Sequence, residues 1–530
     1  MPGKTKAHSF PRLEAAVVIQ DAEPADFERA ISTAGYGKFN VILYIVSTAA
    51  GWSSVFETTT MSYVFPAAEC DLQLTLNHKG ILNAITYAGM ISSACLWGYL
   101  CDTLGRKKLL YIGLLLDGLF FLMAASSQNF PLLMVAKFLG GFIINGPFAA
   151  LTAYLSEFHC AKNRARVQMI LGAIFSLGNL LLPVLALIIL PVQMNFNIGN
   201  LEFHSWNIYL MVSALPALAS GLAFIFLPES PKFLMAMGKN EEALEVFQRV
   251  YRINTGRPME TYPIKNLVDE IKIYTIDVNN SEDNDSVTKT KNTGFRDGFQ
   301  NISPTFFWPN ITKMVLVSLL QFMTMMSLNT LRLWLPQIYQ AMNDYRYYNN
   351  DEEATLCEML EIFQLTNDSM NTTKACEVNS NNTEVYIISM IVAITSIFGY
   401  ITAGTLINSI GKKKLLSILG LVSGSMAMTM YLSRNVLSTI IFSAMFVTFG
   451  SIGINVILAV VVDLTPTSLR TMSVSLTMMF GRLGAALGNM GFPYLLESGC
   501  APPFFSVGSV MIGCSFLACF LPNTDMKALQ

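Results

Sequence analysis

The chain has 530 residues, of which 52% are hydrophobic and only 13% are charged, and its formal net charge is −2. Soluble proteins usually carry about 25% charged residues, so this composition excludes an ordinary soluble domain. The sequence has no basic tract of the kind that binds nucleic acid. Apolar windows of about 20 residues, long enough to span a bilayer, recur along the chain. Together these features indicate a polytopic, all-α membrane protein.

The predicted elements begin after a polar tail. Residues 1–37 lack the apolar core of a cleavable signal peptide, and the amphipathic stretch 26–31 predicts a short helix. Twelve apolar segments follow, and each predicts one transmembrane helix. Their predicted bounds are 39–65, 80–101, 109–127, 130–156, 168–190, 205–227, 313–338, 385–407, 414–432, 437–462, 472–495 and 502–521.

A polar segment separates two sets of six helices. We predict a cytoplasmic tail at 1–37, a six-helix half at 38–228, a cytoplasmic linker at 229–311, a second six-helix half at 312–522, and a tail at 523–530. Apolar residues at helical spacing predict an amphipathic helix over 240–252 of the linker. The composition of 276–297 is typical of disorder.

One polar motif joins the second and third apolar segments. It runs from Gly98 to Lys108 and reads G-x-x-x-D-x-x-G-R-K-K. So short a link makes the two helices antiparallel neighbours, and its glycines would let the backbones approach and turn. The basic residues at its end favour a cytoplasmic membrane face.

The motif occurs twice. Its second copy begins at Gly404, 306 residues after Gly98, and has Asn408 in place of the acid at Asp102. Two acid–base pairs repeat at the same offset, Glu157 with Arg164 and Asp463 with Arg470. Chance together with ordinary basic loops is the competing explanation, but a match at several fixed positions favours an internal duplication.

The duplicated motif resembles the signature loop of the major facilitator superfamily, and the weaker copy falls where that family has one. The resemblance implies two pseudo-symmetric six-helix halves that alternate access to a central site. We interpret the acids and bases at the inner helix ends as a gating network, in competition with simple capping and basic flanks. Its residues are Gly98, Asp102, Gly105, Arg106, Glu157 and Arg164 in the first half and Gly404, Gly411, Lys412, Asp463 and Arg470 in the second.

Charge sorting predicts the topology, because basic residues gather in cytoplasmic loops. The loops assigned to the inner side hold ten lysines and arginines, such as Lys107 and Lys413, and the outer loops hold four. Both termini are therefore predicted in the cytoplasm. The loop 340–384 is then outside, with glycosylation sequons at Asn367, Asn371 and Asn381, whereas those at Asn301 and Asn310 should stay bare. We predict a disulfide between Cys357 and Cys376, with Cys70 and Cys500 as competing partners.

Ionisable residues within the spans are costly and are candidate functional residues by default. Glu57 and Arg332 lie at similar depth in the first and seventh spans, over the central cavity, and we expect each to pair with the other, with a substrate or with water. Lys137, followed by Gly140 and Gly141, resembles the family's basic residue on the fourth helix. The predicted substrate and coupling residues are Glu57, Lys137, Arg332, Asn455 and Arg482. A structural interhelical pair is the competing role for these charges and the more favoured one for Asp117.

Several short motifs resemble the synaptic vesicle glycoprotein 2 group. They include Leu227-Pro228-Glu229-Ser230-Pro231-Lys232-Phe233-Leu234 at the end of the sixth span and Phe203-His204-Ser205-Trp206. The chain departs from that group in a shorter loop between the seventh and eighth spans and in Ser54, where the group has an acid. The helix 7 glutamines and helix 10 motif of the sugar branch are missing.

The sequence thus predicts a secondary transporter for a small charged organic solute, with protons as a candidate coupling ion. The alternative is a non-transporting vesicle or trafficking protein, which the residue Ser54 favours. The sequence contains no Walker loop and no Cys/His cluster with metal-ligand spacing, so we predict neither enzyme activity nor a cofactor. The plasma membrane and an intracellular vesicle membrane are both open as locations.

Overall fold

The computed structural model describes residues 24–192, 194–199, 201–268, 310–349, 354–360, 383–465 and 470–522. The chain divides into two compact units. One unit comprises residues 1–40 and 231–284, and the other comprises residues 41–230 and 285–530. The second unit holds the membrane helices and is the one that matters for the functional site.

The first unit buries the apolar faces of two amphipathic helices, α1 (Phe27–Ala34) and α9 (Asn240–Thr255). The rings of Phe27 and Phe247 lie 6.1 Å apart. The hydroxyl of Tyr262 donates to the carbonyl oxygen of Ala30 at 2.7 Å. The short helices α8 (Pro231–Ala236) and η1 (Met259–Thr261) complete the unit. The two helices predicted at 26–31 and 240–252 are therefore both present, and each supplies the apolar face that the other needs.

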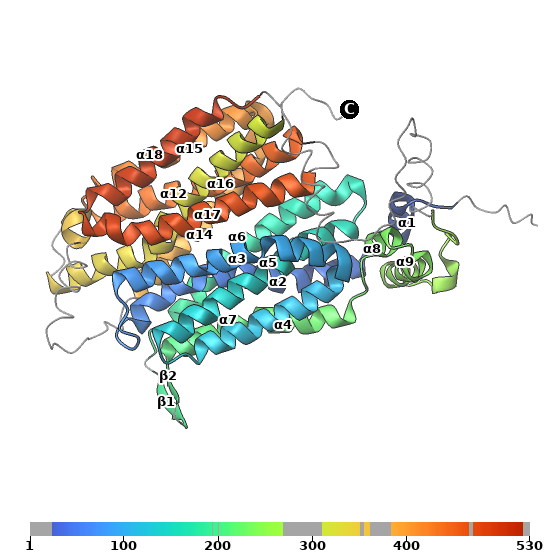
Figure 1. The fold of residues 1–530 in the computed structure, drawn as a ribbon, viewed down its shortest axis with the longest axis horizontal. Coiled ribbons are helices and arrows are strands. Elements are labelled where there is room, and N and C mark those ends of the chain that lie inside the picture. The colour runs from blue at the N-terminus through green and yellow to red at the C-terminus, as the bar shows by residue number, and fades with distance from the viewer. Residues whose placement is uncertain are drawn as a thin grey trace, which may run out of the picture. The chain divides into compact units, whose positions relative to one another are not determined.

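Twelve long helices form the second unit within the described residues, which confirms the predicted fold class. In Figure 1, α12, α15, α16, α17 and α18 of the C-terminal half lie together above α2, α3, α4, α5 and α7 of the N-terminal half. Counted over the described residues, nine of the twelve are long and apolar enough to cross a membrane by themselves. The bounds are α2 Lys38–Ala68, α3 Leu76–Leu104, α4 Arg106–Ala125, α5 Phe130–Glu157, α6 Ala161–Ile189, α7 Ser205–Phe226, α12 Asn310–Tyr348, α14 Thr383–Ile410, α15 Lys412–Met430, α16 Val436–Leu464, α17 Arg470–Glu497 and α18 Ala501–Ala518.

The internal duplication is visible in the helix boundaries. Gly105 before α4 and Gly411 before α15 both have a positive φ, of 90° and 87°. Asn129 caps α5 and Asn435 caps α16, each through its side-chain oxygen. Both pairs are 306 residues apart, the spacing of the repeated motif. Equivalent turns and caps thus begin equivalent helices in the two halves.

The two ends of the helix bundle differ in how the halves meet. We call the end with Gly105 and Gly411 the turn end, and the opposite end, which carries a Cys357–Cys500 bridge, the disulfide end. The largest buried cluster combines residues of both halves, such as Phe65 and Phe504, at the disulfide end. A second cluster at the turn end draws only on the C-terminal half. The halves are therefore packed together at the disulfide end.

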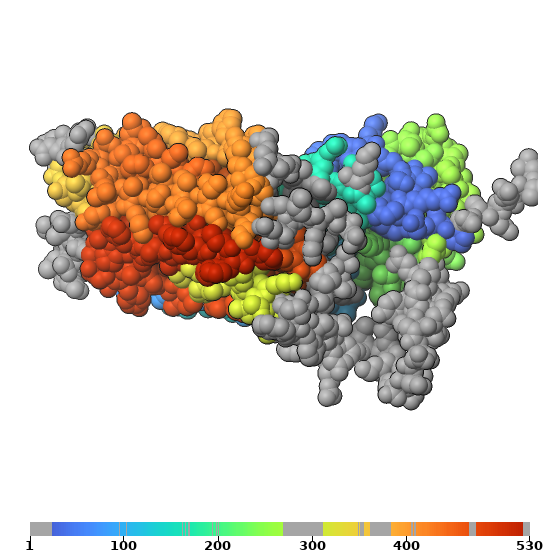
Figure 2. Space-filling model, turned by 90° about the horizontal axis from the view of Figure 1, so that it is seen from above, coloured from blue at the N-terminus to red at the C-terminus, as the bar shows by residue number. Residues whose placement is uncertain are grey.

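The outward faces of the helices are apolar. Figure 2 looks onto the C-terminal half. Large apolar side chains are exposed at helical spacing, for example Leu437, Ile441 and Met445 on α16. The exposed fraction of Phe516 on α18 is 62%. Such a surface is stable only in contact with lipid, as expected for a membrane-embedded body.

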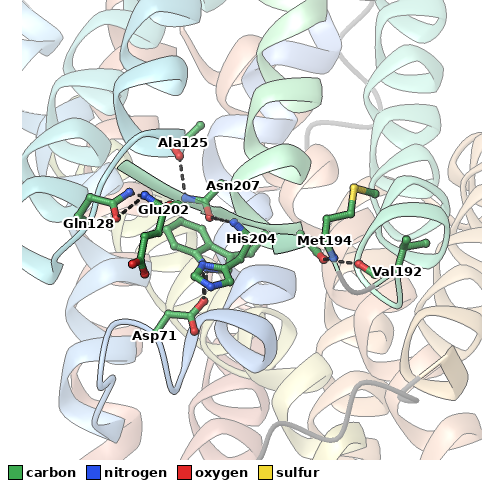
Figure 3. Close-up of polar contacts among 10 residues, drawn as sticks. Asp71, Ala125, Gln128, Val192, Met194, Glu202, His204 and Asn207 are labelled. Carbon is green, nitrogen blue, oxygen red and sulfur yellow. Dashed lines mark hydrogen bonds and ion pairs between the residues drawn. The ribbon is translucent and has the colours of Figure 1, made fainter. Parts of the chain in front are cut away.

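A two-stranded hairpin between α6 and α7 was not predicted. Its strands are β1 (Asn195–Ile198) and β2 (Leu201–His204), and they pair antiparallel. Figure 3 shows the polar contacts around the hairpin. The Asp71 carboxylate accepts from the Trp206 indole at 2.8 Å and lies 3.2 Å from Nδ1 of His204, and the Asn207 amide donates to the Ala125 carbonyl oxygen. Strands this short leave too little alternation to be recognised in a sequence.

Two further expectations differ from the structure. The seventh span was predicted to end at 338, but α12 continues to Tyr348 because Ala341 and Met342 are still buried against the core. Gly98 was expected at a close approach of two backbones. A Cβ atom placed there would have nothing within 4 Å, so the close approach does not occur at this glycine.

Candidate functional site

A buried ion pair joins the first and fourth long helices of the N-terminal half. The Lys137 ammonium on α5 lies 2.8 Å from Oε1 of Glu57 on α2, and both side chains are 1% exposed. Lys137 also donates to the carbonyl oxygen of Glu57 at 2.9 Å. Removing two charges from water costs several kcal/mol per ion, so short contacts of this kind are needed to compensate.

A second carboxyl group belongs to the same site. Asp117 on α4 is fully buried, and neither of its carboxyl oxygens has a hydrogen-bond partner among the described residues. It interacts electrostatically with Glu57 and with Lys137. The ring of Phe121, one turn farther along α4, lies 4.7 Å from the Lys137 ammonium. The site therefore holds two carboxyl groups and one ammonium group in an apolar surrounding.

The glycines after Lys137 explain how the helices come close enough. A Cβ atom at Gly140 would lie 2.7 Å from the Glu57 carboxyl carbon, so only glycine leaves room for this side chain. A Cβ atom at Gly141 would collide with the backbone of Thr86 on α3. Gly140 thus lets α5 pack closely against α2, and Gly141 lets it pack closely against α3.

The C-terminal half has a neutral contact at the equivalent place. Ser443 on α16 is 306 residues after Lys137, and its hydroxyl lies 2.6 Å from the Tyr339 hydroxyl on α12. Helices α12 and α16 correspond to α2 and α5 in the duplicated plan. The same helix pair is therefore held by an ion pair in one half and by two hydroxyl groups in the other.

Of the partners expected for Glu57 and Arg332, the structure contradicts their pairing with each other. Glu57 points within its own half to Lys137, whereas the Arg332 guanidinium donates to the side-chain oxygen of Asn179 on α6. Matched depth along two helices did not determine which way each side chain points. Arg332 nevertheless reaches the region between the halves, because Asn179, which it contacts, belongs to the N-terminal half.

A second arginine makes the same kind of contact across the halves. The Arg482 guanidinium on α17 donates to the side-chain oxygen of Asn145 on α5. The Cζ atom of Arg482 lies 5.9 Å from the centre of the Phe148 ring. Arg332 and Arg482 both act electrostatically on the hydroxyl of Tyr87 on α3. The predicted cavity residues Arg332 and Arg482 are therefore brought to one region between the halves, while Glu57 and Lys137 belong to a separate site.

Asn455, the remaining predicted cavity residue, is connected to that region indirectly. Its side-chain amide donates to the Tyr400 hydroxyl on α14 at 3.1 Å. Arg332 acts electrostatically on the same hydroxyl. The side chain of Asn455 is exposed.

At the turn end, each half contains one ion pair from the predicted gating network. Arg106 at the start of α4 lies 3.3 Å from Glu157 at the end of α5. Lys412 at the start of α15 pairs with Asp463 near the end of α16. Both members of the second pair are 306 residues after those of the first. The expected contact between the basic loop and the acid of the same half thus occurs at equivalent positions.

The N-terminal half has further contacts at this end. The Glu229 carboxylate accepts from the Lys107 backbone amide at 3.0 Å and caps α4. The Arg164 side chain donates to the Ser156 carbonyl oxygen at 3.4 Å. Gly404 lies within α14. The side chains of Asp102 and Arg470 fall outside what the structure describes, so their roles stay predictions.

The disulfide prediction requires a correction. Cys357 is bonded to Cys500, with a Cα–Cα distance of 5.5 Å, and not to Cys376. Proximity in sequence favoured Cys376, but the segment 354–360 is held against the C-terminal half, where the amide of Leu356 donates to the Ser433 carbonyl oxygen. Cys70 is also disulfide-bonded. Asn367, Asn371, Asn381 and Cys376 lie outside the described residues.

Sequence reasoning missed the amide and hydroxyl groups that meet the two arginines. Asn145, Asn179 and Tyr87 lie in apolar helices, and Tyr87 donates to Asn329 of α12 at 3.4 Å. An asparagine inside an apolar span is a usable signal, because its unpaired amide would be costly there. It cannot be assigned to a partner without the three-dimensional arrangement. Among the described residues, no group of three metal-ligating side chains is close enough to hold a metal ion.

The sequence is similar to those of known vesicle glycoproteins. The chain is similar to synaptic vesicle glycoprotein 2B of Rattus norvegicus, with 32% identity over 246 residues, which are 46% of this chain and 36% of that protein. It is 30% identical to synaptic vesicle glycoprotein 2C of Mus musculus over 46% of this chain and 34% of that protein. The matched segments therefore span about a third of these relatives.

Solved structures agree with the fold. The D-xylose-proton symporter superposes with a TM-score of 0.63 at 14% identity, over 93% of this chain and all of that one. A partially occluded inward-open conformation of the xylose transporter XylE from E. coli gives a TM-score of 0.61 at 13% identity, over 92% of this chain and 100% of that chain. The family model described as Major Facilitator Superfamily matches residues 47–356 and 317–529. Because that model matches well over half of the sequence and the helix arrangement agrees with it, the chain belongs to the Major Facilitator Superfamily and resembles its synaptic vesicle glycoprotein 2 group.

Proposed function

We propose that this protein is a secondary transporter that moves a small charged organic solute by alternating access, with protons as the coupling ion. The observation that carries the proposal is the buried site of Glu57, Lys137 and Asp117. Its charges cannot all be balanced by one another, since two carboxyl groups face one ammonium group. A proton on one carboxyl group leaves a neutral set, so this is a site where binding and loss of a proton change the electrostatic balance.

The fold does not require charges at this place. The equivalent contact between α12 and α16 is made by the hydroxyl groups of Tyr339 and Ser443. Replacing a buried ion pair by neutral residues is often neutral or stabilising. The charged version in the N-terminal half therefore favours a functional role over a purely structural one.

The two ends of the bundle supply the elements of a gate. At the disulfide end, the buried Lys79 ammonium pairs with Glu69 at 2.8 Å and donates to Gln337 of the other half at 3.0 Å. At the turn end, the pairs Arg106–Glu157 and Lys412–Asp463 hold each half separately. We propose that the turn end and both termini face the cytoplasm, and that the halves rock about the region between them.

A non-transporting vesicle or trafficking protein is the second candidate. It is favoured by Ser54, which stands three positions before Glu57 in place of an acid found in the synaptic vesicle glycoprotein 2 group. The curated relatives are vesicle glycoproteins by name. Under this reading the Glu57–Lys137 pair would only hold the N-terminal half together.

Reconstitution into liposomes separates the two candidates. The purified chain would be tested with a panel of sugars, amino acids, amines and organic acids, with a pH-sensitive dye trapped inside. We expect at least one solute to cause proton movement that Glu57→Gln abolishes, while the exposed control Glu202→Gln retains it. Solute uptake without proton movement would refute the coupling, and no uptake of any solute would favour the vesicle-protein reading.

A further inference from the structure

Two arginines inside the membrane helices lack a carboxylate partner among the described residues. Arg332 on α12 donates to Asn179, and Arg482 on α17 donates to Asn145. An amide oxygen accepts a hydrogen bond, but it carries no net charge to neutralise a guanidinium group. Each arginine has five N–H donors, and within the described part of the chain one amide oxygen accepts from each.

Other cations of the same helix bundle are paired with carboxylates. Lys137 has Glu57 at 2.8 Å, and Lys79 has Glu69 at 2.8 Å. The pairs at the turn end and the pair Arg346–Glu384 at the disulfide end also join a cation to a carboxylate. The two lysines are 1% exposed, whereas Arg332 and Arg482 are half-buried. The two buried lysines are thus each paired with a carboxylate, whereas the two half-buried arginines are not.

The helix packing places the two arginines along one line. A Cβ atom at Gly481 of α17 would meet Gln321 and Met325 of α12, and one at Gly488 would meet Thr330. The helices therefore run parallel, and Arg332 lies about eight residues, or roughly 12 Å, nearer the disulfide end than Arg482. The Tyr87 hydroxyl donates to Asn329, three residues before Arg332, and Asn145, the partner of Arg482, donates to the carbonyl oxygen of Met90, three residues after Tyr87. The two positive charges therefore lie near one polar region at two depths.

An uncompensated charge at membrane depth is expensive and is retained where it binds something. The planar guanidinium fork matches the two oxygens of a carboxylate, and it also binds sulfonate and phosphate oxygens. A neutral solute would leave both charges uncompensated, and a cationic solute would be repelled by them. We propose that the region between Arg332 and Arg482 is a binding site for an organic anion, with a dicarboxylate as the best-fitting class.

This inference rests on the proposed transport function for its biological meaning, but the binding itself can be measured without transport. Its competitor is a structural role, in which the arginines only brace the halves through Asn179 and Asn145. The two roles predict different effects of an added anion. If the arginines only brace the halves, an anion should not stabilise the folded protein. If they form an anion site, the anion should stabilise the folded protein by an amount set by its concentration relative to its Kd.

The test uses the full-length purified protein and its thermal unfolding at constant ionic strength. The probes are succinate, adipate and suberate, with adipamide as the neutral match and hexamethylenediamine as the cationic match of adipate. The variants are Arg332→Gln, Arg482→Gln and the charge-conserving Arg332→Lys. Arg434→Gln, at an exposed loop position, is the matched control.

We expect at least one dicarboxylate to raise the unfolding temperature of the wild type and of Arg434→Gln, and neither adipamide nor the diamine to do so. Arg332→Gln and Arg482→Gln should each weaken the apparent Kd at least about tenfold, and Arg332→Lys should weaken it less than Arg332→Gln. Equal stabilisation by adipamide or the diamine, or undiminished dicarboxylate binding in both glutamine variants, would overturn the anion site. Binding that passes this test in a protein that takes up no solute of the panel would instead refute transport and leave the anion site in place.

Discussion

Burial decides what each charged residue can do in this protein. The side chains of Glu57 and Lys137 are each 1% exposed and in contact, so neither can exchange its partner for water. By contrast, Lys239 and Glu242 are more than half exposed, and such a surface pair contributes at most about 1 kcal/mol. The mutational sensitivity of this chain should therefore be concentrated at the buried pair.

Glu57→Gln should destabilise the protein strongly, because it removes the carboxylate that the buried Lys137 ammonium contacts directly at 2.8 Å. Breaking a buried pair costs about 3–5 kcal/mol. Combining Glu57→Gln with Lys137→Met should recover most of the loss, whereas combining it with Arg332→Gln should not. Thermal unfolding of the three variants checks this, and an unfolding temperature of Glu57→Gln equal to that of the wild type would contradict the pair.

His159 gives a prediction for pH. It lies between α5 and α6, where its Nδ1 is 2.7 Å from the Leu155 carbonyl oxygen and must donate, so Nε2 accepts from the Tyr44 hydroxyl. Burial lowers the pKa of His159 from its ordinary 6.5, and the backbone contact opposes this to a smaller extent. A lowered pKa means that the folded protein prefers the neutral ring, so this contribution is present above pH 6.5 and is lost as the pH falls through the folded value.

Comparison of the wild type with His159→Phe isolates that contribution. Between about pH 7.5 and about pH 5.5, the wild type should lose more free energy of unfolding than the variant, because the unfolded state alone takes up the proton readily. The measurement is denaturation in detergent at several pH values. Parallel pH dependence of the two proteins would show that His159 is not held neutral.

At the scale of elements, the turns before α4 and α15 depend on glycine. Gly105 has φ 90° and ψ 158°, and Gly411 has φ 87° and ψ 148°, a region that other residues adopt only with strain of about 1–3 kcal/mol. Gly105→Ala and Gly411→Ala should each lower the unfolding temperature. Gly98→Ala is the control from the same motif, since it lies in a helix with open space around it, and it should be neutral or slightly stabilising.

The disulfide ties the segment 354–360 to the start of α18. Because Cys357 and Cys500 are 143 residues apart, the chain-entropy model assigns this crosslink about 5 kcal/mol. Non-reducing peptide mapping should recover a peptide that contains both residues, and Cys500→Ser should unfold at lower temperature. Recovery of Cys357 linked to Cys376 would support the sequence-based pairing and contradict the structure.

The elements were predictable where one local pattern determines them. Apolar length located the long helices, and the 306-residue spacing anticipated the equivalence of Arg106–Glu157 with Lys412–Asp463. Side-chain direction was not predictable, because depth along two helices does not say which neighbour a residue faces. That is why Glu57 was assigned to Arg332, and why the asparagines that meet the arginines were missed.

At the scale of the whole membrane unit, the two halves share a plan but differ in chemistry. Both have equivalent turns, caps and an ion pair at the turn end. Among the described residues, however, the equivalent helices are joined by a buried ion pair in the N-terminal half and by two hydroxyl groups in the C-terminal half. The cross-half contacts of Arg332 and Arg482 involve neutral partners, which can be exchanged at low cost. This asymmetry is why we propose proton binding in one half and solute binding in the region between the halves.

Alternating access is the central claim, and two distances test it most directly. Spin labels on genetically encoded, cysteine-independent side chains would be placed at Gln128 and Arg434 for the disulfide end, and at Lys108 and Lys414 for the turn end. Each pair consists of exposed positions 306 residues apart. Electron–electron distance measurements between about pH 5.5 and about pH 8 should show opposite changes, one pair lengthening as the other shortens, because protonation biases the two states. Distances that change in the same direction, or a single unchanging distance in both pairs at every pH, would contradict the account.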